Sequence, residues 1–387
     1  MDKLKSLGVI KYFVGMKVAL YQPYIKERGG MEKVTAEIAR RLDHDVTILT
    51  FAYDSENTFD SYEDMEVVEI DDFGAPDNFV EQAFNFGIKP LSRKIDTSDY
   101  DLLLISEAGL GSPITFRNHN LPVLGYTHTL LRAALPEFKE TYREGFPAPL
   151  RLFYPLMVFG FNFLEKLTWR HYDFMFTNSE LTKDRIRSKG LMGEDEMEVL
   201  NPGVDTEAEN GEYENYFLYP SRFERYKRQD LAIKAFEEAD LEDFELVLAG
   251  TNADPEYVEE LREMAGENVR IETDVPDERW GSLNRNARAV VFLPENEDFG
   301  LVPIEAGTYS KPVIAVDEGT VRETVIDGET GFLVGAEEEQ IAEKMKYFAE
   351  REDKAREMGK NNRGNAGNYS WEGFIERLDS KIEEMVD

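Results

Sequence analysis

The sequence predicts an α/β protein of two domains, each built on a parallel β-sheet, with the two sheets facing a cleft between the domains. Its 387 residues are enough for two domains of ordinary size, each with its own hydrophobic core. Short apolar runs alternate with amphipathic helical segments, which is the pattern of βαβ units in a parallel sheet. The alternation is interrupted once, by a stretch rich in Pro, Gly, Asn and acidic residues, and then starts again. Two α/β domains in series are the simplest explanation.

Five strands are expected before the interruption. They lie at residues 17–23, 45–51, 101–107, 121–128 and 172–179. The interruption itself, at 201–215, has the composition of an interdomain linker. We therefore expect an N-terminal domain over residues 1–205.

Five more strands are expected after the linker. They lie at residues 216–222, 244–250, 269–274, 287–294 and 311–317. The domain that contains them is expected at residues 206–368. The remaining segment, 369–387, reads as a helix, because Ser370 is a residue type that caps helices and one face is apolar. That face consists of Trp371, Phe374, Ile375, Leu378, Ile382 and Met385.

Composition restricts the partners of the chain. There are 44 Lys and Arg residues against 78 Asp and Glu residues, and the formal net charge is −34. Such a surface repels phosphate backbones, so nucleic acid is not an expected partner, and we favour a solvated surface suited to high salt. The absence of cysteine excludes disulfides and Cys-ligated metals, and four histidines are too few for us to expect a multi-His centre. A Cys-ligated or multi-His metal centre is therefore not expected.

Two apolar segments bear on localisation. The N-terminus shows no secretory signal, because Lys3, Lys5 and Lys11 interrupt its apolar residues, so a cytoplasmic location is expected. The sequence leaves open whether residues 1–15 are an amphipathic extension or precede the native start. Residues 152–164 are the longest uncharged stretch, far short of the ~20 apolar residues of a spanning helix. A buried helix is the favoured interpretation, and a face that rests on a membrane is the alternative.

A pair of glutamates gives the most informative motif. Glu297 and Glu305 bracket a turn that leads into a helix expected to begin near Gly300. A glycine there lets the backbone approach a ligand, and the free N–H groups of Leu301 and Val302 can receive a phosphate. Carboxylates accept hydrogen bonds from pairs of hydroxyls, so the two glutamates suit a sugar on one side and a ribose on the other. Acidic residues are common in this chain, however, and either glutamate alone is explained as well by chance.

Two cations follow the first strand of the second domain. Arg222 ends that strand and Lys227 comes five residues later, before a helix. Cations at the carboxyl edge of a sheet can neutralise a leaving diphosphate, a role that otherwise falls to a metal.

Weaker signals come from the first domain. Gly29 and Gly30 lie between a strand and its helix, where a phosphate-approach loop and a plain turn are equally good interpretations. His128 ends a strand and is therefore expected to face the cleft, although a lone histidine is more often structural.

Taken together, these motifs resemble the retaining glycosyltransferases of family 4, which have the GT-B fold of two Rossmann-like domains with parallel sheets facing an interdomain cleft. The resemblance covers nearly the whole chain. Its most specific part is the paired-glutamate element with DFGLVPI between the glutamates, followed in order by EAG, KPVIA, GTVRE and DGETGFLV. The segments SRFERYKRQDLAIKAF and YTHTLLR look most similar to the mannosyltransferase-like branch that builds surface polysaccharides or lipid-linked oligosaccharides.

The resemblance implies a role for each matching residue. Arg222 and Lys227 would hold the donor diphosphate. Glu305 would hold the ribose hydroxyls and Glu297 the hydroxyls of the donor sugar. The sugar and phosphate pocket would be completed by the backbone of Phe299, Gly300, Leu301 and Val302. From the other domain the site would be closed by Gly29, Gly30 and His128, the last near the reaction centre.

The same resemblance implies the reaction. A hexose, mannose or glucose, would pass from a nucleoside diphosphate sugar to a hydroxyl of a glycan or lipid-linked acceptor, with the anomeric configuration retained. No metal and no cofactor would be needed. The catalytic set would be Arg222, Lys227, His128 and Glu297. The helix at 369–387 would cross back onto the N-terminal domain. Two residues depart from the family pattern, Ser221 and Glu295. Ser221 matches the mannosyltransferase-like branch, whereas Glu295 adds a carboxylate near the donor site and leaves the donor sugar open.

Four alternatives remain at this point. A sugar-nucleotide epimerase or a phosphorylase could use the same fold, and a degenerate module could bind a sugar nucleotide without turning it over. A Rossmann oxidoreductase is the weakest of the four, because the glycine fingerprint of dinucleotide binding is absent. The sequence also leaves open whether the protein, expected in the cytoplasm, binds peripherally to the inner face of the membrane.

Overall fold

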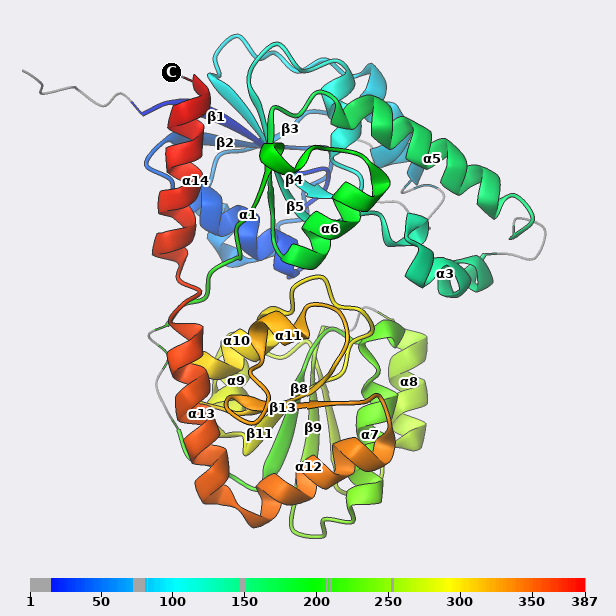
Figure 1. The fold of residues 1–387 in the computed structure, drawn as a ribbon, viewed down its shortest axis with the longest axis vertical. Helices are drawn as coiled ribbons and strands as arrows, with labels where there is room; N and C mark the ends of the chain where they lie inside the picture. Colours follow the sequence, from blue (N-terminus) through cyan, green and yellow to red (C-terminus); the bar gives the residue numbers. More distant parts are fainter. Residues whose placement is uncertain are drawn as a thin grey trace, which may run out of the picture.

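The computed structural model describes residues 15–71, 81, 83–146, 151–206, 208, 211–251 and 254–386. Most of the expected N-terminal extension and the middle of the expected linker lie outside these residues. The described residues form two α/β units, which Figure 1 shows one above the other, with the C-terminal helix running alongside the first unit.

The first unit is built on a parallel sheet with the strand order β3-β2-β1-β4-β5-β6-β7. Its strands are β1 (Lys17–Tyr21), β2 (Asp45–Thr50), β3 (Val67–Glu69), β4 (Leu102–Ala108), β5 (Val123–Thr129), β6 (Phe174–Thr177) and β7 (Met197–Val199). The α-helices discussed below are α1 (Gly30–Arg41), α3 (Lys139–Gly145), α5 (Tyr154–Trp169) and α6 (Glu180–Lys189).

The second unit is built on a parallel sheet with the order β10-β9-β8-β11-β12-β13. Its strands are β8 (Tyr216–Pro220), β9 (Glu245–Gly250), β10 (Val269–Thr273), β11 (Ala289–Phe292), β12 (Val313–Val316) and β13 (Gly331–Val334). Its helices are α7 (Gln229–Ala239), α8 (Pro255–Met264), α9 (Asp277–Asn286), α10 (Leu301–Thr308), α11 (Val321–Thr324), α12 (Glu338–Glu350) and α13 (Glu352–Ala366), and α14 (Trp371–Val386) follows.

Each of the ten expected strands is present, and the prediction of two parallel α/β sheets is confirmed. Strands such as β8 are buried at every position, as expected when helices cover both faces of a parallel sheet. Three strands were not predicted, β3, β7 and β13. All three are outermost in their sheets and only three or four residues long, so they carry too little apolar pattern to be recognised.

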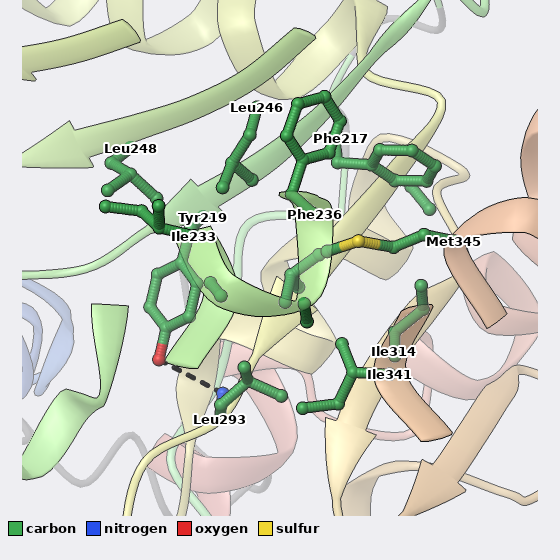
Figure 2. Close-up of a cluster of buried hydrophobic side chains, with 14 of the residues drawn as sticks. Phe217, Tyr219, Ile233, Phe236, Leu246, Leu248, Leu293, Ile314, Ile341 and Met345 are labelled. Atoms are coloured by element: carbon green, nitrogen blue, oxygen red, sulfur yellow. Dashed lines mark hydrogen bonds between the residues drawn. The ribbon is translucent and has the colours of Figure 1, made fainter. Parts of the chain in front are cut away.

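The core of the second unit also supports the loop that carries the predicted cations. Tyr219 is fully buried between the side chains of Leu246 and Leu248 and those of the covering helices (Figure 2). Its hydroxyl accepts a hydrogen bond from the Leu293 amide at 3.1 Å and donates one to the carbonyl of Lys227. A tyrosine of the hydrophobic core thus fixes the backbone of a candidate site residue.

The last two helices pack on different units. Helix α13 packs against α10 of the second unit. Helix α14 instead contributes to the core of the first sheet, where Trp371 and Phe374 are buried together with Val18 and Leu20. The chain therefore returns to the first unit after completing the second (Figure 1).

The favoured interpretation of residues 152–164 as a buried helix is wrong. Helix α5 buries only Tyr154, Glu165, Thr168 and Trp169. Leu152 is 81% exposed and Phe159 is 70% exposed, and Figure 1 shows the helix extending away from the sheet. This helix is apolar on nearly all sides, so the sequence contains no polar face that would reveal which side meets solvent. Among the described residues no helix is long and apolar enough to cross a membrane.

Candidate active site

The predicted site residues lie where loops of the two units meet. The first unit contributes the loop that ends at Gly29 and the start of α1 at Gly30, and the second unit contributes the loop before α10. A Cβ atom placed on Gly30 would lie 3.8 Å from the Leu301 side chain, which is ordinary van der Waals contact across the interface. The structure therefore brings together motifs that are about 270 residues apart in the sequence.

Both helices that meet at this point are directly preceded by a glycine and lack a side-chain cap. Gly29 precedes α1, and Gly300, with φ of 74°, precedes α10. The positive φ explains the glycine at 300, because a residue with a Cβ is strained in that conformation. No side chain caps the first N–H groups of α10, including those of Leu301 and Val302. Two uncapped helix N-termini that lie close together favour an anionic ligand.

Phe299 contributes its backbone rather than its side chain. The phenyl ring is buried with Ile304 and Val204, and its centre lies 6.0 Å from the centre of the Tyr369 ring, with the two rings tilted by 57°. This packing holds the turn before α10 in place.

Lys227 and Glu297 form a buried ion pair. Lys227 Nζ lies 2.6 Å from Glu297 Oε2, and the two side chains are 11% and 14% exposed. Burial alone would lower the pKa of Lys227 and raise that of Glu297. The attraction between the two groups, together with other charged neighbours such as Arg132 and Arg222 for the glutamate, outweighs burial, so the pKa of the lysine is raised and that of the glutamate is lowered. Both groups are therefore charged at neutral pH.

Arg222 points toward the first unit. Its Nη1 donates a hydrogen bond to Glu27 Oε1, from the loop before α1, and its backbone carbonyl accepts one from Gln229 at 2.7 Å. Glu224 is a second carboxylate neighbour at 3.3 Å. The guanidinium predicted to hold a diphosphate is thus placed beside the uncapped start of α1, with carboxylates as its present anionic partners.

Glu305, in the second turn of α10, pairs with a residue that was not predicted. Lys33 of α1 places its Nζ 2.6 Å from Glu305 Oε1. Burial lowers the pKa of Lys33, but Glu305 together with the more distant charges of Asp205 and Glu37 outweighs burial, and the pKa is raised. The lysine lies one turn into α1, on the helix that the paired glycines open, and this position is the only sequence signal for it.

His128 is the next-to-last residue of β5, one position before the strand ends, and is held by polar neighbours. Its Nε2 lies 2.9 Å from the hydroxyl of Ser106, and its carbonyl accepts a hydrogen bond from Asn178 at 2.7 Å. Burial lowers the pKa of His128 to about 3. The imidazole is therefore neutral near pH 7 and can position a ligand by hydrogen bonding, but it does not add a positive charge.

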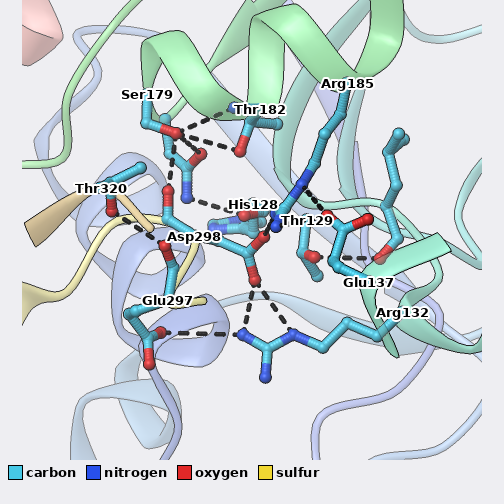
Figure 3. Close-up of polar contacts among 12 residues, drawn as sticks. His128, Thr129, Arg132, Glu137, Ser179, Thr182, Arg185, Glu297, Asp298 and Thr320 are labelled. Carbon is cyan, nitrogen blue, oxygen red and sulfur yellow. Dashed lines mark hydrogen bonds and ion pairs between the residues drawn. The ribbon is translucent and has the colours of Figure 1, made fainter. Parts of the chain in front are cut away.

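Sequence reasoning missed two residues that lie beside this group, Asp298 and Arg132. Arg132 reaches from the first unit to within 3.8 Å of Glu297 Oε1 and donates two hydrogen bonds to Asp298 (Figure 3). Asp298 lies in DFGLVPI and Arg132 lies in YTHTLLR, two segments on which the resemblance rests. The resemblance therefore indicated this region of the chain, but it did not indicate that the two residues pair. Among the described residues, no three metal-binding side chains cluster in a way that could hold an ion.

Two family models match consecutive parts of the chain. The model of Glycosyltransferase Family 4 matches residues 28–208, and the model of Glycosyl transferases group 1 matches residues 205–365. Together they span the second sheet, all of the first sheet except β1, and every predicted site residue. The chain is a family 4 glycosyltransferase.

Curated relatives of this glycosyltransferase extend over most of its length. The α-1,3/1,6-mannosyltransferase ALG2 of Candida glabrata is 26% identical, with 90% of this chain and 88% of the relative covered. The protein of the same name from Rhizomucor pusillus is 25% identical, with 74% and 71% covered. These similarities confirm the prediction of a glycosyltransferase and do not favour the epimerase, phosphorylase or binding-module alternatives.

Solved structures show that the glycosyltransferase has the GT-B fold. The Anabaena protein HepE, in complex with UDP and glucose, superposes with a TM-score of 0.74 at 17% identity, over 95% of this chain and 99% of that one. Sucrose-phosphate synthase from Thermosynechococcus elongatus superposes with a TM-score of 0.75 at 19% identity, over 95% and 98%. The two-domain Rossmann-like arrangement predicted from the sequence is confirmed.

Proposed function

We propose that this glycosyltransferase moves a hexose, with mannose as the first candidate, from a nucleoside diphosphate sugar to a hydroxyl of a lipid-linked glycan. The observation that carries the proposal is the buried Lys227–Glu297 pair, placed with Arg222 beside the uncapped starts of α1 and α10. In this arrangement the cations and the helix N-termini can bind a diphosphate, and the carboxylate can accept hydrogen bonds from sugar hydroxyls. The similarity to ALG2 mannosyltransferases supports the choice of sugar and acceptor.

The chemical step follows from where charge develops. The bond between the anomeric carbon and the diphosphate oxygen breaks, and the leaving group gains negative charge. Arg222, Lys227 and the helix N–H groups stabilise that charge more strongly in the transition state than in the ground state, so no metal is required. The acceptor oxygen attacks from the same face, its proton passes to the leaving phosphate, and the configuration is retained. His128 is neutral and serves to orient the sugar.

The test is a donor screen with chelator present. Purified protein is incubated with GDP-mannose, UDP-glucose, UDP-N-acetylglucosamine or ADP-glucose, together with an isoprenoid-diphosphate glycan acceptor, and the product anomer is determined by NMR. We expect transfer from GDP-mannose, undiminished by EDTA, with an α-linked product. Transfer from another donor would replace the proposed sugar. A requirement for a divalent cation, or an inverted anomer, would refute the mechanism.

We also propose that the enzyme acts as a peripheral protein at the inner face of the membrane, through α5 and its flanks. The exposed apolar side chains of this region are Leu152, Phe153, Leu156, Met157, Phe159 and Phe163. Between 151 and 170 there are three basic residues, Arg151, Lys166 and Arg170, and one acidic residue, so the local charge is 3 − 1 = +2 in a chain of net charge −34. The acidic residue, Glu165, is buried and paired with Lys189. An apolar face with basic flanks fits an anionic lipid surface.

Vesicle flotation tests this contact. Wild-type protein is expected to float with vesicles that contain phosphatidylglycerol, whereas Leu156→Glu/Phe159→Glu protein is expected to stay in solution. Met264→Glu, at an exposed apolar residue of the second domain, is the matched control and should float like wild type. Equal flotation of the double variant and the control would refute the contact through α5.

A further inference from the structure

Asp298 connects the donor loop to the other domain. It lies between β11 and α10, directly after Glu297, and its side chain is 5% exposed. One carboxylate oxygen accepts two hydrogen bonds from Arg132, at 3.1 Å from Nε and 2.6 Å from Nη2. The other oxygen accepts one from Nη1 of Arg185, in α6. The backbone carbonyl of Asp298 accepts a fourth, at 2.6 Å, from the hydroxyl of Ser179, the residue that caps α6. All four bonds cross the domain interface (Figure 3).

The two arginines are themselves fixed. Arg185 is 8% exposed and also donates from Nε to Glu137 at 2.9 Å. Arg132 is 13% exposed, and its guanidinium carbon lies 4.5 Å from the ring centre of Tyr226, which belongs to the second domain. Arg132 is therefore enclosed by second-domain groups on two sides. The two arginines face the buried carboxylate of Asp298 and the exposed carboxylate of Glu137, so the charges of the buried groups are compensated.

Asp298, Arg132, Arg185 and Glu137 form a cluster that links the relative position of the two domains to the position of Glu297. If the domains separate, the cluster loses its cross-domain bonds, and its charges become hydrated again. If they approach, the same bonds pull the loop at 297–300 toward β5 and α6. Arg132 then lies 3.8 Å from Glu297, the residue proposed to hold the transferred sugar. Closure and the position of the sugar-binding carboxylate are thus coupled through one aspartate.

We propose that Asp298 is a positioning residue, an interdomain clamp that holds Glu297 in its working position by binding Arg132 and Arg185. This proposal rests on the proposed function only because one of its tests measures turnover. The clamp acts in the closed state, so its loss should affect the chemical step more than the first binding of a nucleoside diphosphate, which the second domain can hold by itself through Arg222 and Glu305.

The experiment compares Asp298→Asn with a matched control. Asn has the same shape but removes the charge. The control is Asp277→Asn, because Asp277 also accepts a cross-domain bond, from Arg28 at 3.1 Å, but is 84% exposed. We expect Asp298→Asn to lower kcat about tenfold or more while the dissociation constant of the nucleoside diphosphate changes by less than about threefold, because misplaced reacting groups lose rate before they lose binding. The control should change neither.

A distance measurement supplies the second readout, and it does not depend on the donor. The chain has no cysteine, so cysteines introduced at Glu140 in α3 and Glu259 in α8 are the sole labelling sites for a fluorescent pair. We expect Asp298→Asn to shift the ensemble toward longer distances, with and without GDP or UDP, and Arg185→Met/Asp298→Asn to be no more open than Asp298→Asn alone.

The outcomes separate the two proposals. A lower kcat together with longer distances supports the clamp. An unchanged label distance, an unchanged kcat, or a loss of nucleotide affinity alone would overturn it. If no donor is turned over by wild type, the proposed function fails, yet the label distance still decides the clamp. Circular dichroism melting of each variant excludes unfolding as the cause of any change.

Discussion

Lys227 Nζ and Glu297 Oε2 lie 2.6 Å apart in a setting where both side chains are largely buried. The two residues come from different loops of the same sheet, 70 positions apart, and the hydroxyl of Tyr219 fixes the carbonyl of the lysine. The pair therefore presents a positive and a negative group in a fixed relationship before any ligand arrives.

Replacement of Lys227 by Ala should lower turnover by about two to three orders of magnitude, because a donor of charge-assisted hydrogen bonds to the leaving group is lost. The control is Lys234→Ala, which removes a lysine paired at 3.0 Å with Asp230 on the exposed side of α7 and should leave turnover unchanged. Initial rates at saturating donor measure both. Turnover of Lys227→Ala within a factor of three of wild type would exclude the proposed role.

Replacement of Glu27 by Gln should strengthen the binding of a nucleoside diphosphate. Arg222 now pairs with Glu27 across the interface, and a diphosphate must compete with that carboxylate. The pair is partly exposed, so its contribution is at most about 1 kcal/mol, which corresponds to about a fivefold gain in affinity. Titration calorimetry with GDP and UDP measures the gain, and Glu63→Gln, at an exposed residue of the same domain, is the control. Weaker binding by Glu27→Gln would mean that Glu27 helps to hold the ligand.

Replacement of Glu32 by Gln should change how stability depends on pH. Burial and the charge of Glu27 raise the pKa of Glu32 to about 8, against 4.5 for a free glutamate. The folded protein therefore holds this proton more tightly than the unfolded chain does. That stabilisation is complete below pH 4.5 and is lost as the pH rises to 8. Melting temperatures of the variant relative to wild type should rise across this range, because the amide has no proton to lose. A constant difference from pH 4.5 to 8 would contradict the raised pKa.

The fold was predictable because its signals are local. Ten strands were found from short apolar runs whose carboxyl ends carry polar residues, and the linker composition separated the two series. Edge strands such as β7 (Met197–Val199) were missed because three residues carry no periodicity. The exposure of α5 was missed for a related reason, since a helix that is apolar on all sides does not reveal which side is buried.

The site was predictable only in its motif residues. Arg222, Lys227 and Glu297 were recognised because residue type and strand-end position are visible in sequence. The partners Lys33 and Asp298 were not recognised, because each is defined by a contact between the two domains. Lys33 and Glu305 are 272 residues apart in the sequence, and Arg185 and Asp298 are 113 residues apart. Such pairs form only when the two domains pack together, and no local sequence pattern indicates which residues will pair.

Replacement of His128 by Asn should lower turnover about five- to a hundredfold while leaving the pH profile unchanged in shape. The first effect reflects one lost hydrogen bond near the reacting sugar, worth about 1–3 kcal/mol when a buried group is left unpaired. The second follows from burial, which lowers the pKa of His128 to about 3, so that this histidine does not change charge between pH 5 and pH 8. Values of kcat/KM for wild type and variant, measured from pH 5 to pH 8, test both the size of the loss and the shape of the pH profile. An activity limb near pH 6.5 in wild type that disappears in His128→Asn would show instead that the imidazole exchanges a proton during the reaction, and the neutral, orienting role would have to be abandoned.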